Sequence, residues 1–302
     1  MQFLAAYIMQ GRLQAMMVAS SLALLSLLLP PVSIVSTATV ALVSLRLGAK
    51  EGLYVLLCSC LAAALLSMLL IGGYQFALMY ALVLWLPVWV IAVILREGRR
   101  LEFAVETAVA LGVVLVLGFF LLQTDPIAFW RQILTEMMQP MLDAQPDVSK
   151  EMAEQSAAMV ATFMTGGVAA GSVFGLLFGL FLARWWQSAL YNPGGFRIEF
   201  LAMRPHKLWA MALICLSFVA AVTSGFAVDV LRNVVVVLST LFIITGVAVL
   251  HSLFANGKNS RLWLTMFYIT LFTIPHVLVI IAVFGLLDAW LDLRNKFKPN
   301  GA

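Results

Sequence analysis

Few side chains in this sequence could do acid–base or binding chemistry, and those few lie in apolar stretches where an ionisable group is costly. Glu106 stands about one turn inside such a stretch, close to Arg99 and Arg100, so it could contact a ligand or form an ion pair at the membrane surface. His276 follows Pro275 in the middle of the last apolar stretch. Its imidazole could bond the backbone carbonyl that the proline leaves free, or relay a proton. Glu106 and His276 are therefore candidate pocket residues.

Tryptophans form the second group of candidates. Trp85 and Trp89 flank Pro87 and could line a pocket for a flat or apolar ligand, or anchor a helix at the membrane interface. Trp130 lies in the longest polar interval, residues 123–155, where six acidic residues face two basic ones and the net charge is −4. Apolar residues recur there every three to four positions, which predicts an amphipathic helix. It is either a connector on the surface or a lid, holding Trp130, over an outward-facing pocket.

The most regular pattern is a stripe of small residues at four-residue spacing. Such a face lets a neighbouring helix approach closely in a membrane. It predicts packing within this chain, or else against a second copy or another protein. The stripe consists of Gly167, Gly171, Gly175 and Gly179, and a weaker version consists of Ala15, Ala19 and Ala23.

Complete catalytic motifs are absent from the sequence. It has no HExxH zinc motif, no phosphate-binding P-loop, no GxSxG nucleophile turn and no pair of intramembrane aspartates. Cys58, Cys60 and Cys215 have no His or carboxylate beside them, which argues against a disulfide framework or a zinc site. We expect neither an enzyme nor a bound cofactor or metal.

The elements that position these residues are membrane helices. Of the 302 residues, 63% are hydrophobic and 11% are charged, less than half the roughly 25% charged residues of a soluble domain. This composition predicts an all-α polytopic bundle of eight or nine spans in the lipid bilayer. The apolar stretches cover residues 13–29, 31–45, 53–71, 76–95, 103–122, 157–183, 208–228, 234–254 and 262–287. Pro30 and Pro31 separate the first two, which are short and form either a tight hairpin or a re-entrant pair.

The positions of Lys and Arg predict the orientation. Alternate loops from Arg12 to Arg261 hold twelve basic residues, and the loops between them hold three. This asymmetry predicts a protein of the bacterial inner membrane whose N-terminus lies in the cytoplasm. Nine spans would leave the basic C-terminal tail outside, so one of the later stretches does not cross. Because the basic residues are spread over short loops, we expect no nucleic acid partner.

Two segments carry a resemblance to known families. Residues 24–66 read LLSLLLPPVSIVSTATVALVSLRLGAKEGLYVLLCSCLAAALL. Their prolines, short second stretch, and Leu47-Gly48 followed by Gly52 resemble the opening of the substrate-binding S components of energy-coupling-factor (ECF) importers. Residues 191–200 read YNPGGFRIEF and lead to Arg204-Pro205. This segment resembles the YybS-like family of uncharacterised bacterial membrane proteins, which is itself similar to S components.

The resemblance implies a division of the chain and a role. Residues 1–186, including the external segment 124–155, would form a six-helix S-component-like core with an outward pocket; 187–207 would be a cytoplasmic loop and 208–302 additional helices. The alanine face would engage a coupling subunit with its ATPases, and the protein would bind or transport a small molecule without catalysis. The alternative is a scaffold or assembly factor that docks a membrane protein partner or a second copy. Its docking residues would be Arg197, Glu199 and Arg204.

Overall fold

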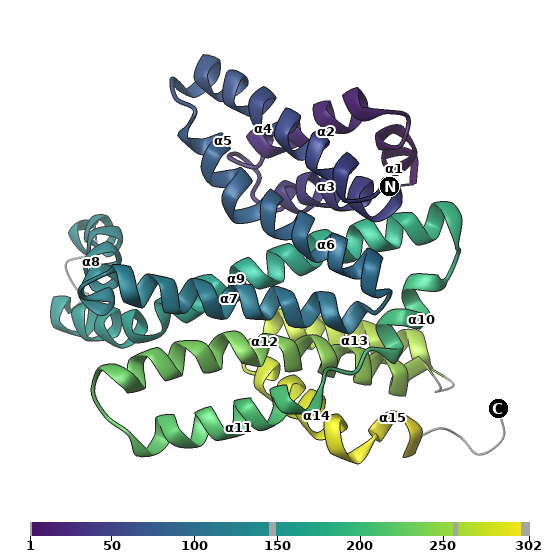
Figure 1. Cartoon of the computed structure of the whole chain (residues 1–302). Coiled ribbons are helices and arrows are strands. Elements are labelled where there is room, and N and C mark those ends of the chain that lie inside the picture. The colour runs from purple at the N-terminus through teal and green to yellow at the C-terminus, as the bar shows by residue number, and fades with distance from the viewer. Residues whose placement is uncertain (1, 145–148, 256–258, 297–302) are drawn as a thin grey trace.

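The computed structural model describes residues 2–144, 149–255 and 259–296, and every regular element in these ranges is a helix (Figure 1). The predicted all-α class is therefore confirmed. Five helical segments are long and apolar enough to cross a membrane: α4 (Ala49–Ile71), the continuous run of α5 (Gln75–Tyr80), η1 (Ala81–Trp85) and α6 (Leu86–Gly98), then α7 (Leu101–Leu122), α9 (Lys150–Tyr191) and α12 (Phe226–Ala255). A sixth results if α10 (Gly195–Ala202) and α11 (Lys207–Val222), bent by 48°, form one span. The described residues thus hold five or six candidate spans where eight or nine were predicted.

The first two apolar stretches form an N-terminal hairpin. After α1 (Gln2–Ile8) come α2 (Arg12–Leu25) and α3 (Val32–Leu47), which are 14 and 16 residues long. At 1.5 Å per residue they reach about 21 and 24 Å, less than the roughly 30 Å of a bilayer core. Arg12 forms an ion pair with Glu51, which holds the start of α2 beside the start of α4. The chain therefore turns back at Pro30-Pro31, as the prolines predict.

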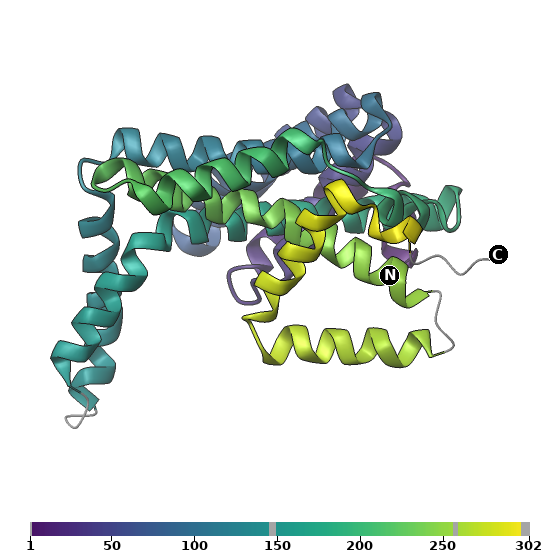
Figure 2. The same ribbon diagram turned by 90° about the horizontal axis from the view of Figure 1, so that it is seen from below.

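A second hairpin lies at the C-terminus. The stretch predicted as one span, residues 262–287, is broken between α13 (Ser260–Thr273) and α14 (Val277–Leu291), and the short α15 (Leu293–Lys296) follows. Figure 2 shows α13 running out and α14 turning back. Prediction of a single continuous span was wrong here, because Pro275 cannot continue the helix.

The turn at Pro275 brings the last described helix back to the link between α10 and α11. Arg294 donates hydrogen bonds to the carbonyls of Leu201, in the last turn of α10, and of Met203, directly after it. The described part of the chain therefore reaches α15 beside the region where α6 meets α7, α9 meets α10, and α12 ends (Figure 1). We call this region, which carries Arg99, Arg100 and Arg261, the basic end.

The amphipathic helix predicted in residues 123–155 is present as α8 (Pro126–Ala144). It packs along the first turns of α9, and the two form an arm that projects from the end opposite the basic end (Figure 2). Since α9 has 42 residues and reaches about 63 Å, its beginning extends well past a single bilayer crossing. The arm stands away from the rest of the bundle, so α8 does not cover it as a lid.

Asn233 of α12 marks the place where the arm joins the bundle. Its buried amide accepts a hydrogen bond from the N–H of Gly166 at 2.5 Å and donates one to the carbonyl of Thr162 at 2.8 Å. These two groups would pair with each other in a regular helix, and inserted side chains of this kind bend helices. A Cβ on Gly166 would lie 2.7 Å from the carbonyl oxygen of Asn233. The contact therefore needs glycine at this position.

The glycine stripe does not pack as predicted. A Cβ on Gly167, Gly171 or Gly175 would meet nothing within 4 Å in the described structure, and only Gly179 faces another helix, at Thr37 of α3. The closest approach of two helices joins α12 to α14 instead. There a Cβ on Gly285 would lie 2.1 Å from the carbonyl oxygen of Phe242. The prediction of packing within this chain is wrong for three of the four stripe glycines, because no part of the described chain lies within 4 Å of a Cβ built there.

Candidate ligand-binding site

Each of the three predicted tryptophans makes a hydrogen bond that serves the fold. Trp85 is completely buried and its indole N–H donates to the hydroxyl of Ser36 at 3.2 Å. Trp89 donates to the carbonyl of Ala49 at 2.9 Å, and Trp130 donates to the hydroxyl of Thr165 within the arm at 2.9 Å. A shared pocket for these three side chains is therefore not formed.

The two ionisable candidates are also apart. The carboxylate of Glu106 accepts a hydrogen bond of 2.7 Å from the backbone N–H of His206, so it helps to begin α11, while Arg100 pairs with Glu102. His276 is exposed at the break between α13 and α14. It lies beside Pro275 as expected, but at a turn and not within a span.

The alanine face of the first stretch is closed to partners. Ala15, Ala19 and Ala23 are fully buried, and the carbonyl of Ala19 accepts a hydrogen bond from Ser36 of α3 at 2.7 Å. These alanines therefore hold α2 against its own chain, and the expectation that they engage a coupling subunit is wrong.

A cavity of about 660 Å³ lies between helices that the sequence did not suggest as a site. It is bounded by α9, α10, α12, α13 and α14. Its wall is largely aromatic and aliphatic, and five of its phenylalanines are Phe174, Phe178, Phe181, Phe196 and Phe200. Pockets for small molecules commonly measure about 300–1,000 Å³ and are mainly apolar with a few polar groups. In size and lining this cavity is similar to such pockets.

Two polar features interrupt the apolar wall. His251 of α12 and Tyr268 of α13 share a hydrogen bond of 2.7 Å, which ties α13 to the bundle across the cavity. Arg197 of α10 lines the cavity and is exposed. The cavity therefore has an apolar body and a cationic group where α10 borders it.

The predicted docking residues are divided between the cavity and internal ion pairs. Glu199 accepts two hydrogen bonds from Arg184, one of them 2.8 Å from Nε. Arg204 pairs with Asp292. Of the three, only Arg197 makes no ion pair or side-chain hydrogen bond within the described residues.

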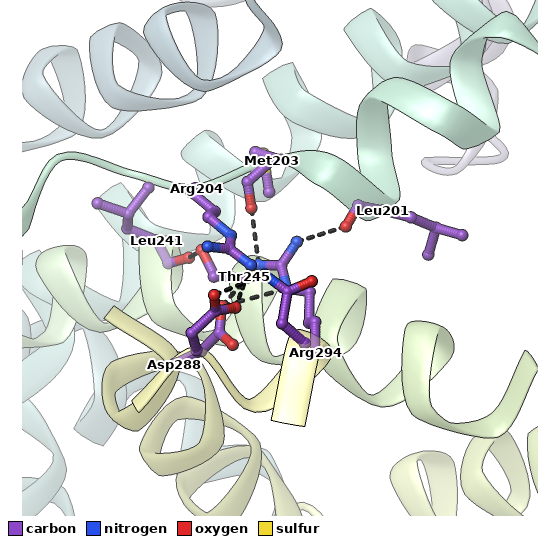
Figure 3. Close-up of polar contacts among 9 residues, drawn as sticks. Leu201, Met203, Arg204, Leu241, Thr245, Asp288 and Arg294 are labelled. Atoms are coloured by element: carbon purple, nitrogen blue, oxygen red, sulfur yellow. Dashed lines mark hydrogen bonds and ion pairs between the residues drawn. The ribbon is translucent and has the colours of Figure 1, made fainter. Parts of the chain in front are cut away.

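A buried ion pair fixes the end of the C-terminal hairpin (Figure 3). The guanidinium of Arg294 lies 3.0 Å from the carboxylate of Asp288, and both side chains are almost fully buried. Burial lowers the pKa of Arg294, and the charge of Asp288 opposes that shift. In the adjacent pair, the hydrogen bond from Arg204 holds the pKa of Asp292 below its usual value, with help from Asn295. These contacts join the α10–α11 link to α14 and α15.

No three His, Cys, Asp or Glu side chains lie together within the described residues in a way that could hold a metal ion. His251 and Tyr268 are the cavity's titratable pair, and they bond each other. The arrangement can surround the apolar part of a molecule, and Arg197 can pair with an anionic group on the same molecule.

Comparison with known families places this chain. Residues 17–289 match the profile of a family described as predicted membrane protein, DUF2232. The chain belongs to the DUF2232 family. Neither the curated proteins nor the solved structures include a significant match. The DUF2232 match, together with several apolar helices, identifies a multi-pass membrane protein, and it covers most of both hairpins, the arm and every residue that lines the cavity.

Sequence reasoning missed the cavity for an identifiable reason. Phe174, Phe178 and Phe181 recur at helical spacing on α9, but an aromatic stripe on a membrane helix is ordinarily a packing or lipid-facing surface. The feature that separates α13 from the bundle is the turn at Pro275. In the sequence of this DUF2232 protein, the signal for such a turn was the basic C-terminal tail, because nine spans would have placed it outside the cell.

Proposed function

We propose that this membrane protein binds a small molecule in the cavity between α9, α10, α12, α13 and α14 and carries or presents it in the manner of an ECF S component, without catalysis. The observation that supports this role is the cavity itself, about 660 Å³ in volume and largely apolar. Solid helix packing would leave few voids larger than a water molecule. A space of this size beside a membrane helix is therefore a reason to expect an occupant.

The proposed setting is the bacterial inner membrane, with the basic end and the N-terminus in the cytoplasm, because Lys and Arg accumulate on that side of membrane proteins. A six-helix core in residues 1–186 remains part of the proposal, and the predicted count becomes eight crossings if residues 262–287 turn back within the membrane. The pocket then differs from that of an S component in position, since four of its five helices follow residue 186. A coupling subunit with ATPases would have to contact a surface other than the buried alanine face.

A scaffold or assembly role is the second candidate, and one observation favours it. Gly167, Gly171 and Gly175 form an open face on α9, with nothing in the described chain within 4 Å of a Cβ built there. Small-residue faces are used by membrane helices to approach one another. A partner helix or a second copy would fit this face, which lies beside the cavity-lining Phe174 and Phe178 of the same helix.

Filling the cavity tests the binding role. The protein is purified from native membranes in a mild detergent, and both the proteins and the small molecules that accompany it are identified by mass spectrometry. Wild type is expected to carry one class of molecule reproducibly. Val247→Trp, which fills the cavity from α12, is expected to lose it, whereas Leu61→Trp, on an exposed position of α4, is expected to retain it.

The same purification separates the two roles. Recovery of a coupling subunit and ATPases supports the importer role. Retention of the small molecule by the folded Val247→Trp variant would contradict the binding proposal. A different protein recovered in fixed ratio, and lost on Gly171→Leu, would support the scaffold instead.

A further inference from the structure

We infer that the occupant of the cavity is a membrane amphiphile with an anionic head group, whose apolar chain lies among the phenylalanines and whose acid group pairs with Arg197. This inference rests on the proposed function, because it names the class of ligand for the same site. It is supported by the lining, by the openings of the cavity and by the charge at its border.

The lining selects an apolar chain. The phenylalanines of α9 and α10 face the aliphatic side chains of Ile243, Ile244 and Val247 on α12, and Leu264 and Leu271 of α13 complete the wall. A polar solute would lose its hydrogen bonds to water in such a place, at about 2–7 kcal/mol for each unpaired group. A hydrocarbon chain loses nothing of this kind.

The cavity also reaches the surface that meets lipid. Phe178 of α9 and Phe272 of α13 line it, yet they are 46% and 84% exposed. The helix α9 is a candidate membrane span, and Phe272 lies among other exposed apolar residues of α13, including Met266 and Ile269. A molecule dissolved in the bilayer can therefore enter from the side, between α9 and α13, without crossing water.

The charge lies where a head group would be. Arg197 stands on α10 at the basic end. Phe174 and Phe272 line the part of the cavity that is farther from the basic end. The neighbouring arginines at this end are already paired: Arg184 with Glu199, Arg204 with Asp292, and Arg294 with Asp288. Within the described residues Arg197 has no such counter-ion. Guanidinium groups bind carboxylates and phosphates with paired hydrogen bonds, so an acidic head group would complete the site.

Binding of three simple probes tests the inference. The full chain is placed in phosphatidylcholine nanodiscs, and binding of oleate, oleyl alcohol and acetate is titrated by native mass spectrometry. Oleate has both a hydrocarbon tail and an acid group. Oleyl alcohol has the tail without the acid, and acetate has the acid without the tail. Arg197→Gln removes the charge from the cavity, and Arg261→Gln removes an exposed charge from the same end of the molecule.

The expected pattern is specific to an anionic amphiphile. Wild type binds oleate more tightly than oleyl alcohol and does not bind acetate. Arg197→Gln weakens oleate at least about tenfold and leaves oleyl alcohol unchanged, while Arg261→Gln leaves both unchanged. Val247→Trp abolishes binding of both oleate and oleyl alcohol.

Two results overturn the inference, and they differ from each other. If Arg197→Gln binds oleate as wild type does while Val247→Trp does not, the cavity binds an apolar ligand and the anionic head group is wrong. If Val247→Trp, still folded, binds every probe as wild type does, the cavity is not the site and the proposed binding role fails as well. Acetate binding equal to that of oleate would show a small-anion site and would also overturn the inference.

Discussion

The two hairpins of this molecule both turn at a proline, but the N-terminal one is tightly packed and the C-terminal one borders a cavity. Each consists of two helices of 14 to 16 residues with a proline at or beside the turn, and each returns the chain to the end from which it started. In the N-terminal hairpin, α3 is almost wholly buried from Ser36 to Leu45. In the C-terminal hairpin, only Phe267 of α13 is buried, and a large cavity lies beside it.

The difference lies in side-chain size and in neighbours, not in hydrophobicity. Small side chains such as Ser36, Thr37 and Ala38 let α2, α4, α6 and α9 approach α3 from several sides. The serine and threonine hydroxyls of α3 donate hydrogen bonds to nearby backbone carbonyls. The side chains of α13 are larger, and two of them, Tyr268 and Phe272, line the cavity and are exposed. A short apolar hairpin is therefore core where small residues let other helices approach, and a cavity wall where its residues are large.

The anchors of the two hairpins provide the largest expected contrast. Arg294→Met leaves Asp288 buried without its counter-ion and releases two backbone carbonyls, so we expect a loss of about 3–5 kcal/mol in the free energy of unfolding. Arg12→Met breaks the exposed pair with Glu51 and should have a much smaller effect, because water and salt screen surface pairs. Thermal unfolding of both variants in mild detergent measures the contrast. Equal losses would mean that the two hairpins are anchored alike.

Removal of a large aromatic side chain probes the two interiors. Trp85→Ala deletes a fully buried indole beside α3 and should destabilise the protein by about 3–5 kcal/mol. Phe272→Ala changes an exposed side chain at the cavity wall, and we expect a change within about 0.5 kcal/mol. Chemical denaturation followed by fluorescence compares the two. A large loss on Phe272→Ala would show that the C-terminal hairpin is packed as firmly as the N-terminal one.

A single methyl group tests how α14 is attached. Gly285→Ala places a Cβ against the backbone of Phe242, which forces α12 and α14 apart at an expected loss of about 1–3 kcal/mol. Gly171→Ala adds the same group to open surface and should leave stability unchanged or slightly raised, since alanine favours helix more than glycine. Melting temperatures measured side by side decide between them. The reverse order would restore the glycine stripe as a packing face of this chain.

The smallest expected effect is a dependence on pH at the end of the C-terminal hairpin. The hydrogen bond from Arg204 lowers the pKa of Asp292 in the folded protein. Its contribution to stability is therefore present above the usual Asp pKa of about 3.9 and is lost as the pH falls through the lower folded value. Wild type should exceed Asp292→Asn in melting temperature between pH 5 and 8 by a constant amount, and the gap should close in acid. A gap that widens in acid would contradict this sign.

Much of the fold could be predicted from residue patterns, and the failures have a common cause. The turn at Pro30-Pro31 and the amphipathic helix around Trp130 follow from local sequence and are present. Hydropathy treats residues 262–287 as uniform, so it could not show that Pro275 reverses the chain. The glycines at 167, 171 and 175 and the alanines at 15, 19 and 23 share one pattern, yet the first set is open and the second is buried. Which face meets another helix depends on the whole bundle, and so does the cavity.

Thiol labelling at the turn of the C-terminal hairpin tests the central claim most directly. In a background with Cys58, Cys60 and Cys215 replaced by alanine, single cysteines are placed at Gln10, Thr124, His276 and Asn295 and treated with a membrane-impermeant maleimide on either side of the membrane. We predict that the cysteines at positions 10 and 295 react from one side, that at 124 from the other, and that at 276 from neither. Reaction at 276 from the same side as 124 would show that α13 crosses the membrane, and it would contradict a hairpin that turns back beside the cavity.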